Sequence, residues 1–509
     1  MKNFIRILAL LLVTISMIGC FAGCGGDGEK NSGTSSTDIQ ISYWRSGLDD
    51  VWLSAIIDAF NAKHPEYHVY YKATADFAAS TAAYGLADVD TVDLYMSTFP
   101  GDTKYAEPLN DILQYKHEGE SKTLGEKFHQ NYLDMMEYPD GNIYSLSYST
   151  SAIGIVYNKE LFQQAGIEVT PRTTDELIAV CSKLADMNIT PTCHFTSGGY
   201  YWKINELWFA QYEGLEAYND FLINPTKEKM LTEDGRYETL KVNQKLLTPE
   251  NVMPGSNVDN HVSVQTKFLN GKAAMMVNGS WLSTEMLNSD KMDNFAMMRN
   301  PVISAIKDKC TTVQNDQQLR SVVSAIDSIT DGEKTEADYK QGDNYVIGSL
   351  TVSAADWAKI KEARTMCFVD HNEMGFVIPN YSNAKEGAKE FVKFFYSDEA
   401  YKIYQSTAKL RLPMEMDQGQ VDTTGWNGFQ LNQYEIHTQA ELCVSSSICS
   451  RSRLFTDGGA WTYGSQNYDY RTLMCTNNES DRITAEDAWK HIQGLINDNY
   501  ADWEANIKN

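Results

Sequence analysis

The sequence predicts an α/β fold that is divided into two lobes. The first observation is length, because 509 residues exceed what one compact core serves. The second is the alternation of short apolar strands with amphipathic helices from Asp38 onward. The third is an ordinary globular composition, 42% apolar and 22% charged. The alternation favours parallel-rich sheets, in which ligands gather at the carboxyl ends of the strands.

The individual elements follow from local periodicity. Alternating apolar and polar residues predict a strand over 39–44, and the apolar spacing of 48–63 predicts a helix that ends before Pro65. Further strands are expected at 67–71, 91–96, 142–146 and 152–157, and further helices at 108–113, 159–165, 175–187, 202–212, 386–396 and 485–499. No internal repeat stands out.

The N-terminus has the pattern of an export signal. A positive start with Lys2 and Arg6 precedes the apolar run 7–18, which is too short for an ordinary membrane span. Phe21-Ala-Gly-Cys24 resembles a lipobox, so residues 1–23 are expected to be a lipoprotein signal peptide for the Sec route and Cys24 the lipidated residue. Cys20 is an alternative site, and a plain secretory signal is an alternative interpretation. Residues 24–37 are a polar tether.

Charge and aromatic content restrict the ligand. A formal charge of −25 argues against nucleic acid and anionic lipid, which both require a basic face. It fits a neutral or cationic ligand. The 29 Tyr and 10 Trp residues suit a binder of sugars or peptides, since flat rings with polar edges can cover such ligands.

Motifs for catalysis, metals and cofactors are missing from the sequence. It contains no P-loop, no GxSxG, no GxGxxG after a strand and no His or Cys cluster at metal spacing. The neighbouring carboxylates Asp49 and Asp50 do not predict a glycosidase, because hydrolysis needs two carboxyl groups held across the scissile bond. Among the nine Cys, Cys443 and Cys449 are the pair most easily bridged. We therefore expect no catalytic residue, no metal and no cofactor.

Four segments carry a resemblance to a known family. GIVYNKELFQQAGI (154–167) resembles the first segment that crosses between lobes in family 1 extracellular solute-binding proteins, the sugar-capturing subunits of ABC importers. GKAAMMVNGSW (271–281) resembles the second crossover, the segment 375–395 resembles the third, and Arg411-Leu-Pro413 resembles a short motif near the C-terminal helices. The matches are spread in order over nearly the whole mature chain.

The resemblance implies a two-lobed periplasmic-binding-protein-like fold of type II, similar to maltose-binding protein. Its lobes are joined by crossover hinge strands, and the ligand lies in the cleft between them. We expect lobe 1 to comprise 38–150 and 282–372, with an insertion at about 302–370, and lobe 2 to comprise 151–281 and 373–509.

The resemblance also implies where ligand contacts lie, namely at strand ends that face the cleft. The ligand-binding residues expected there are Trp44, Arg45, Ser46, Tyr95, Thr98, Phe99, Ser151, Tyr200, Trp202, Trp281 and Trp461. Ser151 stands where relatives often carry a carboxylate, so a maltose-like hydrogen-bonding scheme is in doubt. Trp281 is expected to stack on the C–H face of a sugar, the alternative being a Trp that packs in a lobe core.

The expected function is therefore an extracellular, lipid-anchored binding protein. It would capture a mono- or oligosaccharide as a monomer, close by a hinge motion and deliver the ligand to an ABC permease, with the lipid as its membrane contact. A peptide or polyamine binder of the same fold is the alternative, a carbohydrate-active enzyme ranks below it, and a purely structural surface lipoprotein would not need aromatic residues converging on a cleft.

Overall fold

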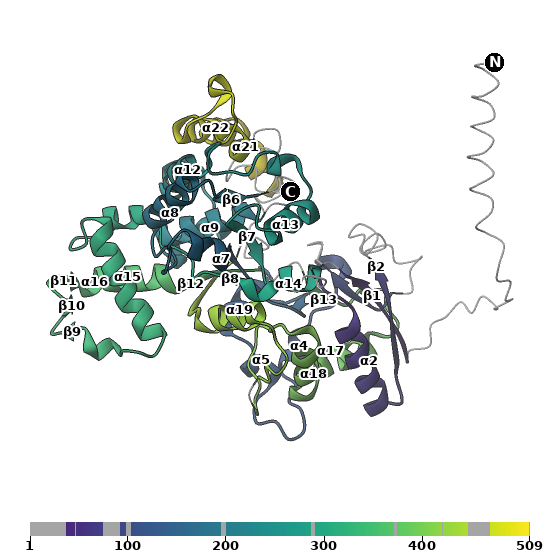
Figure 1. Cartoon of the computed structure of the whole chain (residues 1–509). Coiled ribbons are helices and arrows are strands. Elements are labelled where there is room, and N and C mark those ends of the chain that lie inside the picture. Colours follow the sequence, from purple (N-terminus) through teal and green to yellow (C-terminus); the bar gives the residue numbers. More distant parts are fainter. Residues whose placement is uncertain are drawn as a thin grey trace, which may run out of the picture. The chain divides into compact units, whose positions relative to one another are not determined.

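A computed structural model describes residues 37–507 except 46, 75–91, 98–102, 195–199, 287–290, 371–373, 420 and 446–468. The chain divides into two units, Met1–Ser35 and Ser36–Asn509, and every described residue belongs to the second. The α/β class is confirmed, since the described residues form two larger sheets, covered by helices, and one small sheet (Figure 1). Cys20 and Cys24 lie outside the described residues.

The first sheet has the strand order β2-β1-β3-β13-β4. Its strands are β1 (Asp38–Trp44), β2 (His68–Thr74), β3 (Leu94–Ser97), β4 (Leu146–Ser147) and β13 (Gly375–Val377). β1 is parallel to β2 and β3, whereas β13 is antiparallel to β3 and β4. The strand predicted at 39–44 is confirmed by β1.

Helices from two separate parts of the chain cover this sheet and share one buried cluster with it. They are α2 (Val51–Lys63), α4 (Asn110–Leu113), α5 (Leu124–Lys127), α6 (Gln130–Met136), α17 (Lys385–Phe395) and α18 (Asp398–Ala408). The 3₁₀ turn η1 (Thr103–Tyr105) lies between β3 and α4 in the chain and has no buried residue. The apolar face of α17 shows why it packs here, because Ala388, Phe391, Val392 and Phe395 recur at helical spacing and are all buried.

The second sheet has the order β14-β12-β5-β7-β6, with β8 also paired to β5. Its strands are β5 (Ser151–Asn158), β6 (Thr192–Cys193), β7 (Met275–Gly279), β8 (Phe295–Met297), β12 (Met366–Asp370) and β14 (Leu442–Val444). β5 is antiparallel to β7, β8 and β12, so this sheet is mixed rather than parallel-rich as predicted. Cys443 pairs in register with Cys367, and both thiols are free; Cys449 lies outside the described residues.

Most of the remaining helices surround the second sheet. They are α7 (Lys159–Gln164), α8 (Thr174–Asp186), α9 (Tyr201–Glu213), α10 (Leu215–Ile223), α11 (Lys227–Thr232), α12 (Gly235–Leu246), α13 (His261–Leu269), α14 (Leu282–Glu285), α19 (Gly428–Gln439), α21 (Tyr470–Met474) and α22 (Ala485–Ile507), with the 3₁₀ turns η2 (Ser256–Val258), η3 (Met292–Asn294), η4 (Ser304–Lys309) and η8 (Glu479–Asp481). Local sequence sets their ends: the Thr173 hydroxyl oxygen accepts a 3.2 Å bond from the backbone N–H of Glu176 and caps α8.

The region predicted as an insertion, 302–370, contains its own small structure. It holds α15 (Asp316–Thr330), the turn η5 (Glu336–Asp338), β9 (Lys340–Gln341), β10 (Asn344–Ile347), β11 (Leu350–Ser353) and α16 (Ala354–Thr365). α15 and α16 pack against each other, and β9, β10 and β11 form an antiparallel sheet beside them (Figure 1). The rings of Tyr345 and Trp357 stack 4.2 Å apart and join this region to the core of the second sheet.

The strand pairings correct the predicted assignment of segments to lobes. The range 282–372 was expected in lobe 1, yet β8 and β12 hydrogen-bond into the second sheet. The range 373–509 was expected in lobe 2, yet β13, α17 and α18 belong to the first sheet and its core. The chain therefore passes from the second sheet to the first between β12 and β13. The segment 271–281 is no crossover, because β7 and the β8 that follows it both pair with β5.

Candidate functional site

One edge of the second sheet gathers the features from which a site can be built. β7 ends at Gly279, which pairs in register with Ile153 near the start of the antiparallel strand β5. The turn after β7 and the residues that lead into β5 therefore lie at the same edge. β4 of the first sheet ends at Ser147, only a few residues before β5 begins at Ser151, so this edge is also where the chain passes from one sheet to the other.

Trp281 lies at this edge as predicted, but its ring is covered. The side chain is 7% exposed and belongs to the buried cluster of the second sheet. Its indole meets the ring of Tyr200 at a centroid distance of 4.7 Å and an angle of 65°. It also covers Gly279, where a Cβ would lie 2.2 Å from the Trp281 ring. This placement favours the packing alternative for Trp281, and the ligand-stacking role stays a prediction.

The end of β1 is brought close to the same region. Trp44 is half-buried, and Arg45 is exposed and paired with Asp50. Gly47 lies against the side chain of Glu285 in α14. A Cβ atom at position 47 would lie 3.0 Å from the Glu285 Cγ. Burial raises the pKa of Glu285, whose Oε2 accepts a 2.8 Å bond from the Gln265 amide. The segment that follows β1 thus lies beside α14, which follows the turn after β7.

Other predicted residues have different surroundings. Tyr95 is 3% exposed in a small cluster of the first sheet, and its hydroxyl shares a 2.7 Å hydrogen bond with the Tyr381 hydroxyl, while its ligand contact stays a prediction. Ser151 is buried at the start of β5. Trp202 lies in the first turn of α9. Ser46, Thr98, Phe99 and Trp461 lie outside the described residues.

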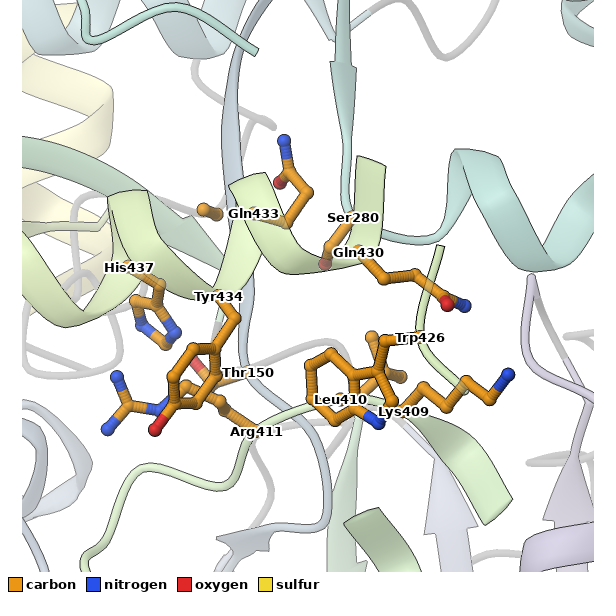
Figure 2. Close-up of a pocket in the computed structure, with 11 residues that line it drawn as sticks. Thr150, Ser280, Lys409, Leu410, Arg411, Trp426, Gln430, Gln433, Tyr434 and His437 are labelled. Carbon is orange, nitrogen blue, oxygen red and sulfur yellow. The ribbon is translucent and has the colours of Figure 1, made fainter. Parts of the chain in front are cut away.

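A pocket that the site prediction did not include lies at the same edge. We call it the Trp426 pocket; it is partly open to solvent, and its cavity volume is about 20 Å³, enough for one water molecule. It is lined by Thr150, Ala152, Ser280, Lys409, Leu410, Arg411, Trp426, Gln430, Gln433, Tyr434 and His437 (Figure 2). These residues come from the start of β5, the turn after β7, the segment after α18, and α19 with the loop before it.

Several polar atoms of this pocket are buried without a hydrogen-bond partner among the described residues. They are Nε1 of Trp426, Nε of Arg411, both amide atoms of Gln433 and the hydroxyl of Ser280. A buried polar group without a partner costs about 1–3 kcal/mol. Such atoms gathered in one pocket therefore indicate a place for water or a polar ligand.

Arg411 connects the two sides of the pocket. The residues that flank it, Leu410 and Leu412, belong to the core of the first sheet. Its Nη1 donates a 2.8 Å bond to the Thr438 hydroxyl of α19, and its guanidinium lies 5.2 Å from the ring centre of Tyr434 on the same helix. A shift between the first core and α19 would therefore disturb the Arg411 contacts.

Sequence signals for this pocket existed only in part. Arg411 stands in the Arg411-Leu-Pro413 motif, and that resemblance alone predicts no ligand contact for its side chain. Trp426 follows a glycine and precedes the Asn427 cap of α19, much as Trp281 follows Gly279-Ser280 and directly precedes α14. Gln433 gave no signal, since its unpaired amide results from its tertiary surroundings.

No group of three or more His, Cys, Asp or Glu side chains suited to a metal occurs in the described part of the chain. Within that same part, no helix combines the length and the apolar character needed to cross a membrane. His194, next to the predicted aromatic loop, is 2% exposed; burial lowers its pKa to about 4, so its ring is neutral near pH 7.

Comparisons with known proteins give the same fold. The family model for bacterial extracellular solute-binding proteins matches residues 46–402. Solved structures with this fold include RafE of Streptococcus pneumoniae (15% identity, 91% of this chain and 98% of that chain, TM-score 0.60). Another is the GacH receptor of Streptomyces glaucescens (15% identity, 92% and 99%, TM-score 0.58). The two-lobed fold expected from the sequence is confirmed.

Curated relatives are matched over part of their length. A binding protein of Brucella abortus strain 2308 is 27% identical over 181 residues, which is 36% of this chain and 41% of the relative, so the chain spans about two fifths of it. The multiple sugar-binding protein of Streptococcus mutans is 25% identical over 296 residues, 55% of this chain and 66% of that protein. Because the family model covers most of the chain, the protein belongs to the bacterial extracellular solute-binding proteins.

Proposed function

We propose that this protein is the saccharide-capturing, lipid-anchored subunit of an ABC importer. The observation that carries the proposal is the family match together with a polar, aromatic pocket where the chain passes between the two sheets. The names of similar proteins support a sugar: one is called a multiple sugar-binding protein, RafE was solved in complex with raffinose, and GacH was solved with acarbose.

The Trp426 pocket supports this ligand class chemically. A sugar presents C–H groups on its faces and hydroxyl groups around its rim. The rings of Trp426 and Tyr434 meet edge to face, 5.7 Å apart at 89°. Trp426 is 8% exposed, so the half-buried Tyr434 is the ring of this pair that offers apolar surface for such a face. The unpaired amide of Gln433 and hydroxyl of Ser280 can each donate and accept hydrogen bonds, as a sugar hydroxyl requires.

Capture would proceed by hinge closure. The chain passes between the sheets at the residues before β5, between β12 and β13, and after α18. Lys409, which follows α18, has a left-handed backbone (φ 55°), a conformation that non-glycine residues rarely adopt, and Arg411 lies two residues further on. Ligand contacts made from both sides stabilise the closed form by their differential affinity for it. The closed form is what a permease would recognise.

The predicted contacts Trp44, Arg45 and Tyr200 remain part of the proposal, as does the lipid at Cys24. A peptide or polyamine ligand remains the alternative, in keeping with the charge of −25. Catalysis is not part of the proposal, since the family and the similar structures are solute-binding proteins.

A thermal-shift screen of residues 36–509 tests the ligand class. These residues hold both buried cores and so suffice for measurements in solution. A saccharide that binds the folded state raises its melting temperature in a concentration-dependent way. Raffinose, chitin oligosaccharides, maltose and single sugars form one arm, and spermidine and short peptides form the other. Stabilisation by the second arm alone would exclude a saccharide-binding role.

A further inference from the structure

A larger hollow of the structure is bordered by the region 302–370, which was predicted as an insertion. We call it the α15 groove; its cavity volume is about 650 Å³, and it is open to solvent. Its walls come from the segments 169–172, 297–299, 324–333 and 432–439, with Tyr157 and Arg364. This volume lies within the range of about 300–1,000 Å³ that is usual for ligand sites. The insertion therefore builds one wall of a space large enough for a binding partner.

Helix α19 separates this groove from the Trp426 pocket. The groove takes from α19 the residues Asn432, Glu435, Ile436 and Gln439, whereas the Trp426 pocket takes Gln430, Gln433, Tyr434 and His437. Each set recurs every three or four residues, and the two sets are offset by two positions, about 200° around a helix of 3.6 residues per turn. They form stripes on opposite faces of α19, so the α15 groove is distinct from the pocket of the proposed saccharide function.

The cations of the α15 groove are each paired with a carboxylate. Arg364 donates to both carboxylate oxygens of Asp327, at 2.7 and 2.9 Å. Arg299 pairs with Asp331, and Arg172 pairs with a carboxylate that does not line the groove. The three guanidinium groups are thus engaged in holding the walls of the groove together.

Two further carboxylates of the groove are not neutralised in this way. Glu333 and Glu435 are exposed, and neither has an ion-pair partner among the described residues. Glu435 accepts one 3.2 Å bond from the neutral amide of Gln439. Because the guanidinium groups are paired, the charge that the α15 groove presents to solvent is negative. A partner with positive charge complements it.

An exposed apolar side chain lies among these charges. Val169 is exposed and lines the groove together with the half-buried ring of Tyr157. Pockets for small molecules are lined mainly by apolar side chains and enclose most of the ligand. The α15 groove is open and largely charged at its exposed positions, with an apolar contact among them. This composition is typical of a protein–protein contact, in which polar groups surround an apolar centre.

We propose that the α15 groove docks a basic segment of a partner protein, in which a Lys or Arg side chain stands next to an apolar one. The cationic group pairs with Glu333 and Glu435, and the apolar side chain packs on Val169 and Tyr157. The net charge of −25 attracts such a partner at long range. This inference goes beyond the proposed function, because capture of a saccharide does not require the groove, and either can fail without the other.

Fluorescence anisotropy on residues 36–509 tests the chemistry of the partner. The probe is a short labelled peptide in which Lys and Leu alternate, and matched peptides carry Glu in place of Lys or Ser in place of Leu. We expect the Lys–Leu peptide to bind less tightly as salt is raised, since exposed charges are screened. The Ser peptide should bind about fivefold less tightly, because it lacks the apolar contact, and the Glu peptide should not bind.

Two outcomes of this experiment overturn the inference. One is that the Lys–Leu peptide does not bind. The other is that spermidine, a cation without a polypeptide chain, displaces the peptide at an equal concentration, since the groove would then be a site for small cations.

Two matched substitutions locate the contact. Val169→Arg places a positive charge in the groove, and Val51→Arg places the same charge on α2, outside the lining. The two valines are 64% and 62% exposed, so neither change disturbs a core. We expect Val169→Arg to weaken binding of the Lys–Leu peptide about tenfold and Val51→Arg to weaken it no more than about twofold. Equal effects of the two variants contradict the inference.

A pair of charge-neutralising variants tests the carboxylates. Glu333→Gln combined with Glu435→Gln is compared with Glu216→Gln combined with Glu228→Gln, which removes the same charge from exposed positions of α10 and α11. We expect the first double variant to weaken binding of the Lys–Leu peptide about fivefold or more, and the second to change it no more than about twofold. If both double variants bind alike, Glu333 and Glu435 do not receive the peptide and the inference is refuted.

Discussion

The indole of Trp281 meets the ring of Tyr200 edge to face, with centroids 4.7 Å apart. Trp281 directly precedes α14 and follows β7 by two residues, and Tyr200 directly precedes α9. The contact therefore joins the N-terminal ends of α9 and α14. Tyr200 is half-buried and Trp281 is 7% exposed. The pair thus closes the edge of the sheet next to the Trp426 pocket, to which the intervening Ser280 contributes.

Trp281→Ala is expected to destabilise the ligand-free protein. The ring is part of a buried cluster, and truncation of a buried Trp typically costs about 3–5 kcal/mol. Chemical unfolding without ligand measures the loss, and Trp281→Phe, which keeps an aromatic ring, should lose less. Unfolding like that of the parent, together with lost saccharide binding, would contradict the packing role and support the stacking role expected from the sequence.

Gly279→Ala is expected to displace the Trp281 ring. A Cβ at position 279 would lie 2.2 Å from that ring, so the indole or the strand end has to move, and overpacking of this kind costs about 1–3 kcal/mol. Gly494→Ala is the matched control, because a Cβ there meets no atom within 4 Å in the helix α22. In that helix the same substitution should stabilise by about 0.5–1 kcal/mol. Effects of the same sign at both glycines would refute this account.

Local elements of this fold were predictable, and their assembly was not. The strand at 39–44 and the helix at 386–396 have strong periodicity, and the structure contains them as β1 and α17. Which sheet a segment joins depends on pairing between distant residues. β13 hydrogen-bonds to β3 and β4, far away in the sequence, so its three residues gave no local signal for their sheet.

The site was predictable to the extent that it depends on strand ends. The turn after β7 lies at the predicted edge, and Ser280 lines the pocket there. The exposure of a side chain was harder to predict than its strand. Tyr95 lies in a strand that the sequence predicts, yet its side chain is buried, because β13 and Tyr381 cover it. Trp426 and Gln433 reach the pocket through the packing of α19, which periodicity alone cannot orient.

Lys127→Met is expected to cost about 3–5 kcal/mol of stability, since it leaves buried acceptors without their cation. The Lys127 side chain is fully buried, and its Nζ donates to Glu120 (2.8 Å), Asp398 (2.7 Å) and the carbonyl oxygen of Tyr396 (2.9 Å). Urea unfolding at pH 7 measures the loss.

The control for Lys127 is Lys63→Met, which breaks an ion pair with Glu399 in which both side chains are 52% exposed. An exposed pair contributes about 0–1 kcal/mol. If both variants lose the same small amount, the buried network does not stabilise the first core.

Lipid attachment at Cys24 is expected from the lipobox resemblance. Cells fed labelled palmitate should incorporate label into the parent protein and into Cys20→Ala, whereas Cys24→Ala should lack it and be misprocessed or released. Electrophoresis with label detection reads the result. Label retained in Cys24→Ala and lost in Cys20→Ala would move the attachment site to Cys20.

Glu206 is expected to make stability fall as pH rises from about 5 to 8. The carboxyl is 4% exposed, and burial raises its pKa from 4.5 to about 7, although the Tyr218 hydroxyl donates it a 2.8 Å bond. Between these two pKa values the folded state keeps a proton that the unfolded chain releases. The stability that Glu206 contributes is therefore fully present below the unfolded pKa and is lost as the pH rises through the folded pKa.

Glu206→Gln cannot ionise, so its loss of stability across this range should be smaller than that of the parent by about 3 kcal/mol. Glu486→Gln, at a 63% exposed side chain, controls for the change of charge. Denaturant unfolding at pH 5 and pH 8 gives the comparison, and a pH dependence in Glu206→Gln that parallels the parent's would show that Glu206 does not carry it.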